Sequence, residues 1–530
     1  MDTGTVTLNG AGNSVGRGLQ IGMDASATVN YTTAGGALTI GKGITDVLEI
    51  GVNSSNVIGT NGTLNLTGLN QFTANVDTIR LGIASAGFTG RGTLNLAVNN
   101  DISAGTSIVV GFSGGSGNNS VTSAVFFGGG ISNVTTRTLT FGGNKSIGNA
   151  TVAAGGTVNL LGFGANTLDL FVGSYDNTGT TGSTSNFNMT GGTLTASLNN
   201  LIVAQKINGL SGGTSGVFTV TGTANAISAN AVSLGNVAGN NAAGTNLTNG
   251  TLNFGGGTFV VNNDVAMATW ANNTVGTPAT TGTLNVTGGT FTIGGNITRS
   301  TADEARSNSF VNVNGGTLDL QNQAGGDTTP GTITASQLAF RSGALADIAS
   351  ASLAATTATN SGIAGTVGDA LIVRDKTIAF SVTLTGATGG SIHYEAAGGG
   401  TGGAIGGALD FGGVGRTVNV ENSAGAINEL TLTGAISNVP IFTKIGAGKL
   451  LIDTVLGSSA TTLNADAGET HLAQHQTLAA LNIASGAIVT IEAVLPTPPA
   501  PDFPGANAVP EPGALSLLAL GALAFLRRRR

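Results

Sequence analysis

Residues Gly62 to Leu66 read GTLNL, and the same five residues return from Gly92 to Leu96. Variants of this phrase recur further along the chain: GTVNL from Gly156, GTLTA from Gly192, GTLNF from Gly250, GTLNV from Gly282 and GTLDL from Gly316. The successive spacings are 30, 64, 36, 58, 32 and 34 residues, and the two long spacings are about double the others. A period of 30 to 36 residues predicts a stacked repeat architecture.

Apolar and polar residues alternate within each phrase. Leu64 and Leu66 can face inward while the neighbouring Thr and Asn side chains face outward, as a strand with one buried face requires. The preceding Gly allows a bend without a Cβ clash, and Gly, Asn, Ser and Thr fill the intervals with turn-forming residues. We therefore expect an all-β fold, a right-handed parallel β-helix (β-solenoid) in which each coil buries its apolar face by stacking on its neighbours.

One polar position of the phrase is usually asparagine. It is occupied by Asn65, Asn95, Asn159, Asn253 and Asn285. Amide side chains that stack once per coil can form a hydrogen-bonded ladder, as they do in other stacked parallel strands. We predict such a ladder along the solenoid.

The composition excludes several classes of protein. Hydrophobic residues make up 40% of the 530 residues and the mean hydropathy is +0.27, so a disordered polar chain is excluded. The formal charge is −7, with 19 basic and 26 acidic residues, which argues against a nucleic-acid partner. The chain has no Cys, so it has no disulfide, no thiolate nucleophile and no Cys-ligated metal site.

The regularity of the repeats divides the body of the chain. Residues 1–300 are predicted to be regular solenoid repeats, residues 301–408 a less regular continuation, and residues 409–492 regular again. The core of the last region is TKIGAGKLLI, Thr443 to Ile452. This core resembles the autotransporter-associated β-strand repeat, although Ile445 stands where that family usually has Thr. The resemblance covers about 80 residues, so residues 409–492 are predicted to be an autotransporter-associated β-strand repeat region.

The C-terminal part of the chain has a different composition. Seven of the ten prolines lie between Pro496 and Pro512, so residues 493–508 are predicted to be an extended linker. Fourteen uncharged residues follow, Gly513–Leu526. We expect them to form a short hydrophobic helix, about 21 Å long, that enters the inner membrane transiently. The chain then ends with Arg527, Arg528, Arg529 and Arg530, which are predicted to remain cytoplasmic.

Residues 509–530 resemble a PEP-CTERM sorting signal. The motif residues are Val509, Pro510, Glu511 and Pro512, and the apolar segment and terminal arginines follow in the expected order. The resemblance implies an exported protein of a Gram-negative bacterium, and such bacteria often produce exopolysaccharide. It also implies a partner, the exosortase, a membrane-embedded cysteine protease-transpeptidase that would cleave at or near the Pro-Glu-Pro motif.

The N-terminal residues MDTGTVTLNG have neither a basic n-region nor an apolar h-region, so they are not a secretory signal peptide. This conflicts with the export that the C-terminal signal implies, so either the chain is cytoplasmic or its true start lies upstream. We expect an upstream start, because GTVTLNG already has the pattern of a strand.

No candidate catalytic, cofactor-binding or metal-binding residue is predicted. His471 and His475 have the spacing of a zincin helix but lack its Glu, and surface histidines are the better interpretation. His393 stands alone in the sequence. The dense charged spots of the body are Arg374–Lys376 and Ala302–Arg306, which suit solvated turns better than paired catalytic carboxylates.

The leading prediction is an exported, non-enzymatic structural or adhesin-like protein of the cell surface or extracellular matrix. It would be tethered to the membrane before processing, and exopolysaccharide or other surface components are candidate partners. The alternatives are a β-helix enzyme acting on polysaccharide and an autotransporter passenger-like fragment. A groove that gathers three or more carboxylates and basic residues from adjacent coils would support the enzyme.

Overall fold

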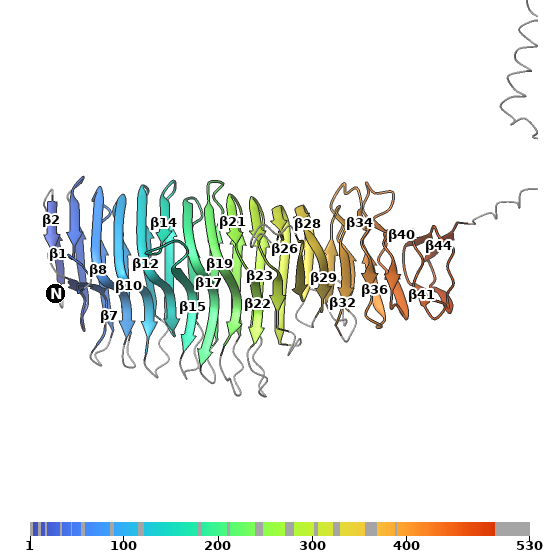
Figure 1. The fold of residues 1–530 in the computed structure, drawn as a ribbon, viewed down its shortest axis with the longest axis horizontal. Helices are drawn as coiled ribbons and strands as arrows, with labels where there is room; N and C mark the ends of the chain where they lie inside the picture. Colours follow the sequence, from blue (N-terminus) through green and yellow to red (C-terminus); the bar gives the residue numbers. More distant parts are fainter. Residues whose placement is uncertain are drawn as a thin grey trace, which may run out of the picture. The chain divides into compact units, whose positions relative to one another are not determined.

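The computed structural model describes residues 4–492 with short gaps (Figure 1). The gaps are 9–11, 16–17, 32–33, 44, 55–58, 85–88, 115–120, 177–182, 209–212, 239–246, 271–279, 301–305, 322–328, 356–367 and 387–389. Residues 1–491 form one compact unit and residues 492–530 a second. The expected hydrophobic helix at 513–526 and the sorting residues at 509–512 and 527–530 lie outside the described residues.

The first unit is a β-solenoid whose strands stack in parallel along three faces. Face A is one continuous ladder from end to end. Its strands are β1 (Gly4–Leu8), β4 (Ala27–Tyr31), β7 (Thr60–Asn65), β9 (Gly90–Asn95), β11 (Thr122–Phe127), β13 (Ile147–Val152), β16 (Ser183–Asn188), β18 (Thr214–Val220), β20 (Thr248–Phe254), β23 (Thr280–Val286), β26 (Ser307–Asp319), β28 (Gln337–Ala346), β30 (Asp369–Val373), β33 (Ser391–Tyr394), β36 (Arg416–Val420), β39 (Ile441–Ile445), β41 (Thr462–Ala465) and β43 (Ala480–Ile483).

Faces B and C follow face A within each coil. In the first part of the rod, several long strands bend at the corner between two faces, so that the first half of each strand lies on face B and the second half on face C. These are β8 (Gln71–Ala84), β10 (Asn99–Ser113), β12 (Ile131–Asn144), β17 (Thr193–Asn208) and β19 (Ala226–Val237). The other strands of face B are β2 (Gly12–Val15), β5 (Ala37–Ile40), β14 (Thr157–Leu161), β21 (Thr258–Val261) and β24 (Thr290–Ile293), continued by the second halves of β26 and β28.

Face C and the C-terminal part of face B complete the coils. The other strands of face C are β3 (Leu19–Ile21), β6 (Val47–Ile50), β15 (Leu168–Asp176), β22 (Val265–Trp270), β25 (Ile297–Arg299), β27 (Gly331–Ala335), β29 (Ile348–Leu353), β32 (Ser381–Leu384), β35 (Leu409–Asp410) and β38 (Ile436–Ser437). From residue 377 onward, face B is a separate six-stranded sheet. It contains β31 (Thr377–Ile378), β34 (Gly403–Ile405), β37 (Leu430–Leu432), β40 (Lys449–Ile452), β42 (Glu469–Leu472) and β44 (Ile488–Ile491).

The coils become shorter toward the C-terminal end. Asn285 lies beside Asn253 of the preceding coil, which is 32 residues earlier in the chain. Asn482 lies beside Asn464, which is only 18 residues earlier. The predicted period therefore holds for the first part of the rod, whereas the later coils have shorter turns.

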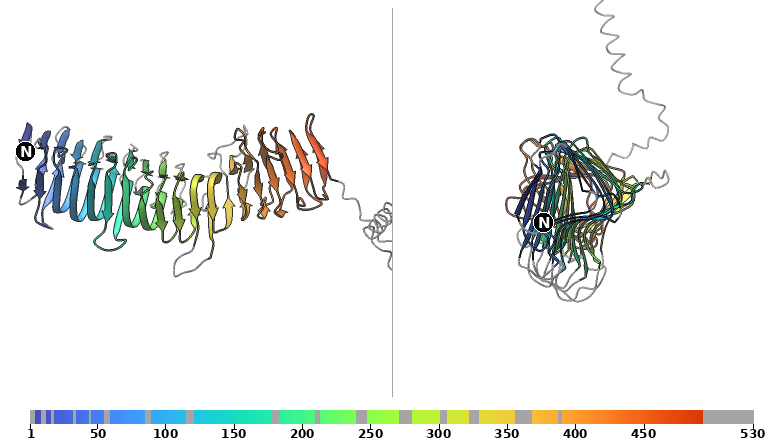
Figure 2. Two further views of the ribbon diagram at one scale, coloured as in Figure 1. Left: turned by 90° about the horizontal axis from the view of Figure 1, so that it is seen from above. Right: turned by 90° about the vertical axis from the view of Figure 1, so that its left-hand side faces the viewer.

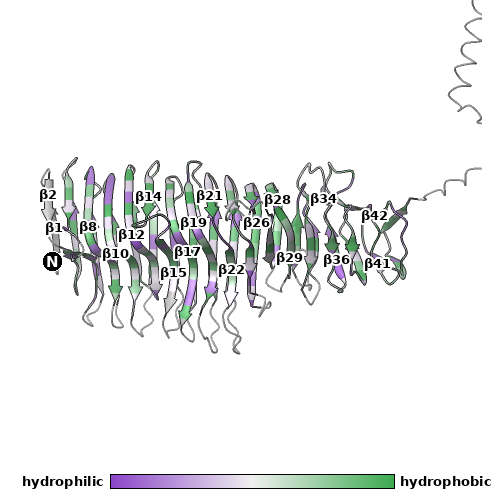
Figure 3. Ribbon diagram, viewed as in Figure 1, coloured by the Kyte–Doolittle hydropathy of each residue, from purple (hydrophilic) through white to green (hydrophobic). Residues whose placement is uncertain are grey.

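Alternation of buried and half-buried residues explains why these segments stack. In β20, every second residue is buried, and Leu252 and Phe254 are fully enclosed. Apolar and polar positions interleave along the strands (Figure 3), and the coils superpose around one interior when viewed along the axis (Figure 2). Aromatic rings also stack from coil to coil, as Phe187 and Phe218 do with ring centroids 5.1 Å apart. Each coil therefore depends on its neighbours for its core.

The recurring phrase occurs on two faces rather than one. The phrases from Gly62, Gly92, Gly250 and Gly282 belong to face A, whereas those from Gly156, Gly192 and Gly316 belong to face B. The long spacings therefore combine whole coils with a step from one face to the other. The prediction that Asn159 shares a ladder with the other asparagines was wrong, because it lies on face B and bonds Asn133, with Nδ2 2.8 Å from Oδ1.

The ladder of asparagine side chains on face A consists of separate segments. Asn65 donates to Asn30, with Nδ2 3.3 Å from Oδ1. Further along, Asn285 donates to Asn253 at 2.7 Å and accepts from Asn312 at 2.8 Å. The predicted role of asparagine at this position is confirmed for these coils.

The predicted all-β solenoid is confirmed for the described residues, which contain no helix. Within them, accordingly, there is no helix of the length and apolar character that crossing a membrane requires. The handedness and the internal domain boundaries stay predictions.

Candidate functional site

One group of charged residues is shared by consecutive coils in the C-terminal half. We call it the charged cluster. Its members are Arg341, Asp369, Arg374, His393, Glu395 and Glu421. Three of them, Arg374, Glu395 and Glu421, directly follow the stacked strands β30, β33 and β36. Because stacked parallel strands end at the same corner of the solenoid, residues far apart in the sequence meet there.

His393 is the centre of this cluster. Its Nδ1 atom lies 3.0 Å from Oδ2 of Asp369 and its Nε2 atom lies 2.9 Å from Oε1 of Glu421. The Asp369 carboxylate is completely buried and also accepts a hydrogen bond from the Ser391 hydroxyl. Burial lowers the pKa of His393, but the hydrogen bonds and charges of Asp369 and Glu421 raise it, and the pKa is raised overall.

The second half of the cluster is an arginine pair on one carboxylate. Oε2 of Glu395 lies 2.5 Å from Nε of Arg341 and 2.8 Å from Nη2 of Arg374. Glu421 is further held by the backbone N–H of Ala396, at 2.9 Å. Each carboxylate of the cluster therefore has a positively charged or N–H partner from a neighbouring coil.

These contacts decide what the cluster can do chemically. Both ring nitrogens of His393 are engaged, so the imidazole has no free position for a substrate. Across the part of the chain that the structure describes, no group of three His, Asp or Glu side chains is arranged to hold a metal ion. The geometry therefore favours a structural role, in which ion pairs link neighbouring coils, over a role in acid-base catalysis.

Sequence reasoning identified Arg374–Lys376 as a charged spot but missed its partners. His393 looked isolated because Asp369 and Glu421 lie 24 and 28 residues away along the chain. A distance of about one coil is the signal that could have linked them. Of the other histidines, His475 is exposed, as predicted, and His471 is half-buried in β42.

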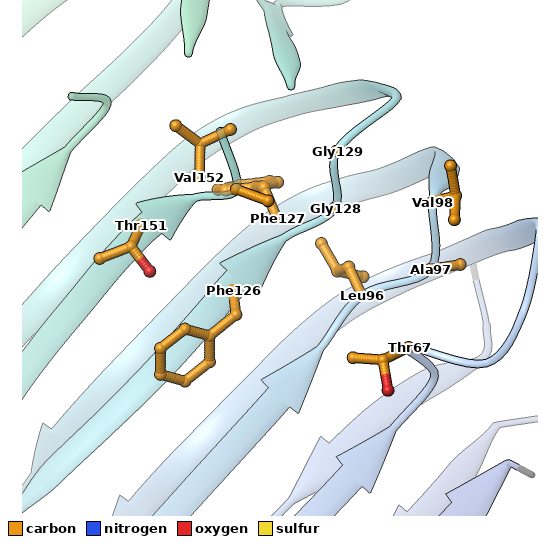
Figure 4. Close-up of a pocket in the computed structure, with 11 residues that line it drawn as sticks. Thr67, Leu96, Ala97, Val98, Phe126, Phe127, Gly128, Gly129, Thr151 and Val152 are labelled. Carbon is orange, nitrogen blue, oxygen red and sulfur yellow. The ribbon is translucent and has the colours of Figure 1, made fainter. Parts of the chain in front are cut away.

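A second candidate site is an uncharged groove where face A turns into face B. We call it the corner groove (Figure 4). Its volume is about 410 Å³, and it is lined by Thr67, Leu96, Ala97, Val98, Phe126, Phe127, Gly128, Gly129, Thr151, Val152 and Ala153. None of these residues is charged, so the groove suits a neutral ligand.

Phe126 gives the corner groove its distinctive chemistry. It pairs in register with Asn95 and Thr151, and so it stands where neighbouring coils of face A carry polar residues. Its side chain is 44% exposed, whereas most aromatic rings of the described core are enclosed. An aromatic ring between polar side chains offers one stacking surface and nearby hydrogen-bonding groups.

The sequence comparison identifies the C-terminal segment. Residues 508–530 match the PEP-CTERM protein-sorting motif. The match includes the predicted residues Val509 to Pro512 and the four terminal arginines. The PEP-CTERM motif implies export, membrane tethering during sorting and processing by an exosortase. No curated protein and no solved structure matches the chain.

Proposed function

We propose that the chain is a structural or adhesin-like rod that an exosortase releases at the cell surface or into the extracellular matrix. The observation that carries the proposal is the PEP-CTERM motif at 508–530, which follows a continuous solenoid that extends to Ile491. A rod of stacked coils presents long, regular faces, and such faces suit repeated contacts with matrix or surface components.

The C-terminal tail would act in three steps. Residues 513–526 enter the inner membrane, and Arg527 to Arg530 remain on the cytoplasmic side, so the solenoid lies on the opposite side. The exosortase then cleaves at or near Val509–Pro512 and separates the rod from its anchor. Residues 493–508, which are rich in Pro, link the last coil to the cleavage motif in the sequence.

The family of the repeats is part of the same proposal. In Thr443–Ile452, two strands flank a turn at Gly446 to Gly448, and Lys444 reaches back to the carbonyls of that turn. This arrangement is consistent with the resemblance of the segment to the autotransporter-associated β-strand repeat.

A polysaccharide-acting enzyme is the second candidate, and the charged cluster is the observation that bears on it. Asp369, Glu395 and Glu421 do come together from adjacent coils with basic residues. However, these groups neutralise one another, and the corner groove lies among other coils. The pairing supports the non-enzymatic proposal.

The test is export with and without the exosortase. The full chain is fused to a cleavable secretion leader and produced in an exosortase-positive host and in its deletion strain. Intact mass of the exported product should show loss of at least Gly513–Arg530 in the first strain only. Replacement of Pro510 and Pro512 by Ala should block the loss, while replacement of Pro498 and Pro499 in the linker should not. Retention of the tail in both strains would refute exosortase processing.

A further inference from the structure

The last coil of the solenoid is open on its outer side. Its strands β43 and β44 pair with β41 and β42 on one side. Within the described residues, no strand pairs with their other side. The outward backbone N–H and C=O groups of this coil therefore form an unpaired edge, which can bind another strand.

The side chains of this edge are apolar and exposed. Ile483 is 52% exposed and Ile488 is 58% exposed, and Leu481 and Ile491 are exposed beside them. The segment Leu478–Ile491 contains no charged residue and no Pro. Natural sheet edges are usually protected by Lys, Pro or a bulge, so this edge lacks the usual protection against pairing.

The sequence that follows the last coil differs in composition from the sequences that form coils. Even the shortest coil, between Asn464 and Asn482, takes 18 residues. The segment 493–508, which joins the solenoid to the sorting residues, is shorter than this coil, and five of its residues are Pro. Pro has no N–H to donate to a β-ladder. The composition of this sequence makes it a poor partner for a β-edge, so we look for the partner in another molecule.

We infer that the partner is a second copy of this chain, and that two rods join tail to tail through β43 and β44. An edge strand presents both donors and acceptors, so two copies related by a twofold axis can pair antiparallel. The uncharged, apolar surface is its own best complement because it offers no charge to recognise a different partner. Asn482 ends an amide ladder, with Nδ2 2.8 Å from Oδ1 of Asn464, so its remaining amide groups face the second copy.

The first experiment measures the mass of the full chain in detergent solution by light scattering at increasing concentration. The single chain is 51.6 kDa, and the wild-type protein should approach twice this mass. The double variant Ile483→Lys/Ile488→Lys should remain at the single mass, because two exposed positions then carry charge at the edge. The control Ile427→Lys changes a side chain that is 86% exposed in an earlier coil and should leave the dimer intact.

The second experiment locates the contact. Because the chain has no Cys, Asn482→Cys introduces a single thiol, and mild oxidation should yield a disulfide-linked dimer. Ile427→Cys should yield none. A wild-type mass that stays at one chain, equal masses for the wild type and the lysine variant, or growth beyond a dimer would each overturn the tail-to-tail arrangement. The hydrophobic tail is present in every variant, so association through it would appear as equal masses.

Discussion

Nδ1 of His393 lies 3.0 Å from Oδ2 of Asp369, a carboxylate that is completely enclosed between coils. The two residues belong to the adjacent strands β33 and β30, so this contact fastens one coil to the next. Burial opposes the charge on the imidazole, but the hydrogen bonds and charges of Asp369 and Glu421 outweigh it and raise the pKa of His393. The folded protein therefore holds this proton more tightly than the unfolded chain.

The first prediction concerns pH. The pKa of His393 is higher in the folded protein than in the unfolded chain, where it is about 6.5. The protonated imidazole therefore stabilises the fold fully at pH values below 6.5, and this stabilisation is lost as the pH rises through the pKa of the folded protein. Urea unfolding at pH 6.0 and 8.0 should show a lower free energy of unfolding at pH 8.0. His393→Gln should remove this difference and cost about 3 kcal/mol at pH 6.0, because it takes the charged imidazole away from the buried Asp369 carboxylate. The exposed His475→Gln should keep the wild-type pH dependence.

The second prediction concerns Lys444, which is completely buried. Its Nζ atom donates to the carbonyls of Gly446, Gly448 and Ala467 at 2.6, 2.5 and 2.8 Å. Lys444→Met should lower the free energy of unfolding by about 3 kcal/mol, since it takes the charged donor away from the buried carbonyl of Gly448 and the half-buried carbonyls of Gly446 and Ala467. The side-chain ammonium of the nearby half-buried Lys449 bonds one carboxylate in the described contacts, that of Glu469 at 2.9 Å, so Lys449→Met should cost less than about 1 kcal/mol. Equal costs would contradict this role for Lys444.

The sequence was sufficient to predict the class of fold because the apolar alternation and the period are local patterns. Leu64 and Leu66 were predicted to face inward, and both are fully buried. The assignment of phrases to faces was not predictable in the same way. GTVNL from Gly156 and GTLNL from Gly62 have nearly the same residues, yet the first lies on face B and the second on face A, so the phrase itself does not specify its face.

The charged cluster was harder still to predict. A contact such as that between Arg341 and Glu395 joins residues 54 positions apart, across two coils. The coil lengths in this region vary, so a fixed period cannot place both residues at one corner. Lys444 illustrates the same limit, because the alternation of β39 places this charged residue on the same inward face as Phe442, and only the structure shows that its ammonium group bonds the carbonyls of the turn that follows.

The third prediction tests the asparagine ladder of face A. Asn285 makes two amide hydrogen bonds, to Asn253 and from Asn312. Asn285→Ala should lower the free energy of unfolding by about 1 to 2 kcal/mol, the contribution of two partly buried hydrogen bonds. Asn95 occupies the same position beside Phe126 and makes no side-chain hydrogen bond in the described part of the chain, so Asn95→Ala is the matched control. A cost as large at Asn95 would show that burial, not the ladder, is responsible.

The fourth prediction tests the corner groove as a contact site for a neutral polysaccharide. Phe126 interrupts the polar positions of face A with an exposed ring, and the lining carries no charge. Phe126→Asn should restore a polar residue beside Asn95 and change the free energy of unfolding by about 1 kcal/mol or less. It should also reduce co-sedimentation of the full chain with insoluble cellulose about tenfold in affinity, which corresponds to about 1.4 kcal/mol.

The matched control for Phe126 is Phe163, which is also half-exposed but contacts a cation. The guanidinium of Arg137 lies 5.4 Å from its ring centroid, so one face of this ring is occupied. Phe163→Asn should leave cellulose binding unchanged. Because the two substitutions remove the same ring and add the same amide, only a ligand seated in the corner groove distinguishes them. Equal loss in both variants would indicate nonspecific adhesion to exposed rings, and retained binding by Phe126→Asn would exclude the groove as the contact site.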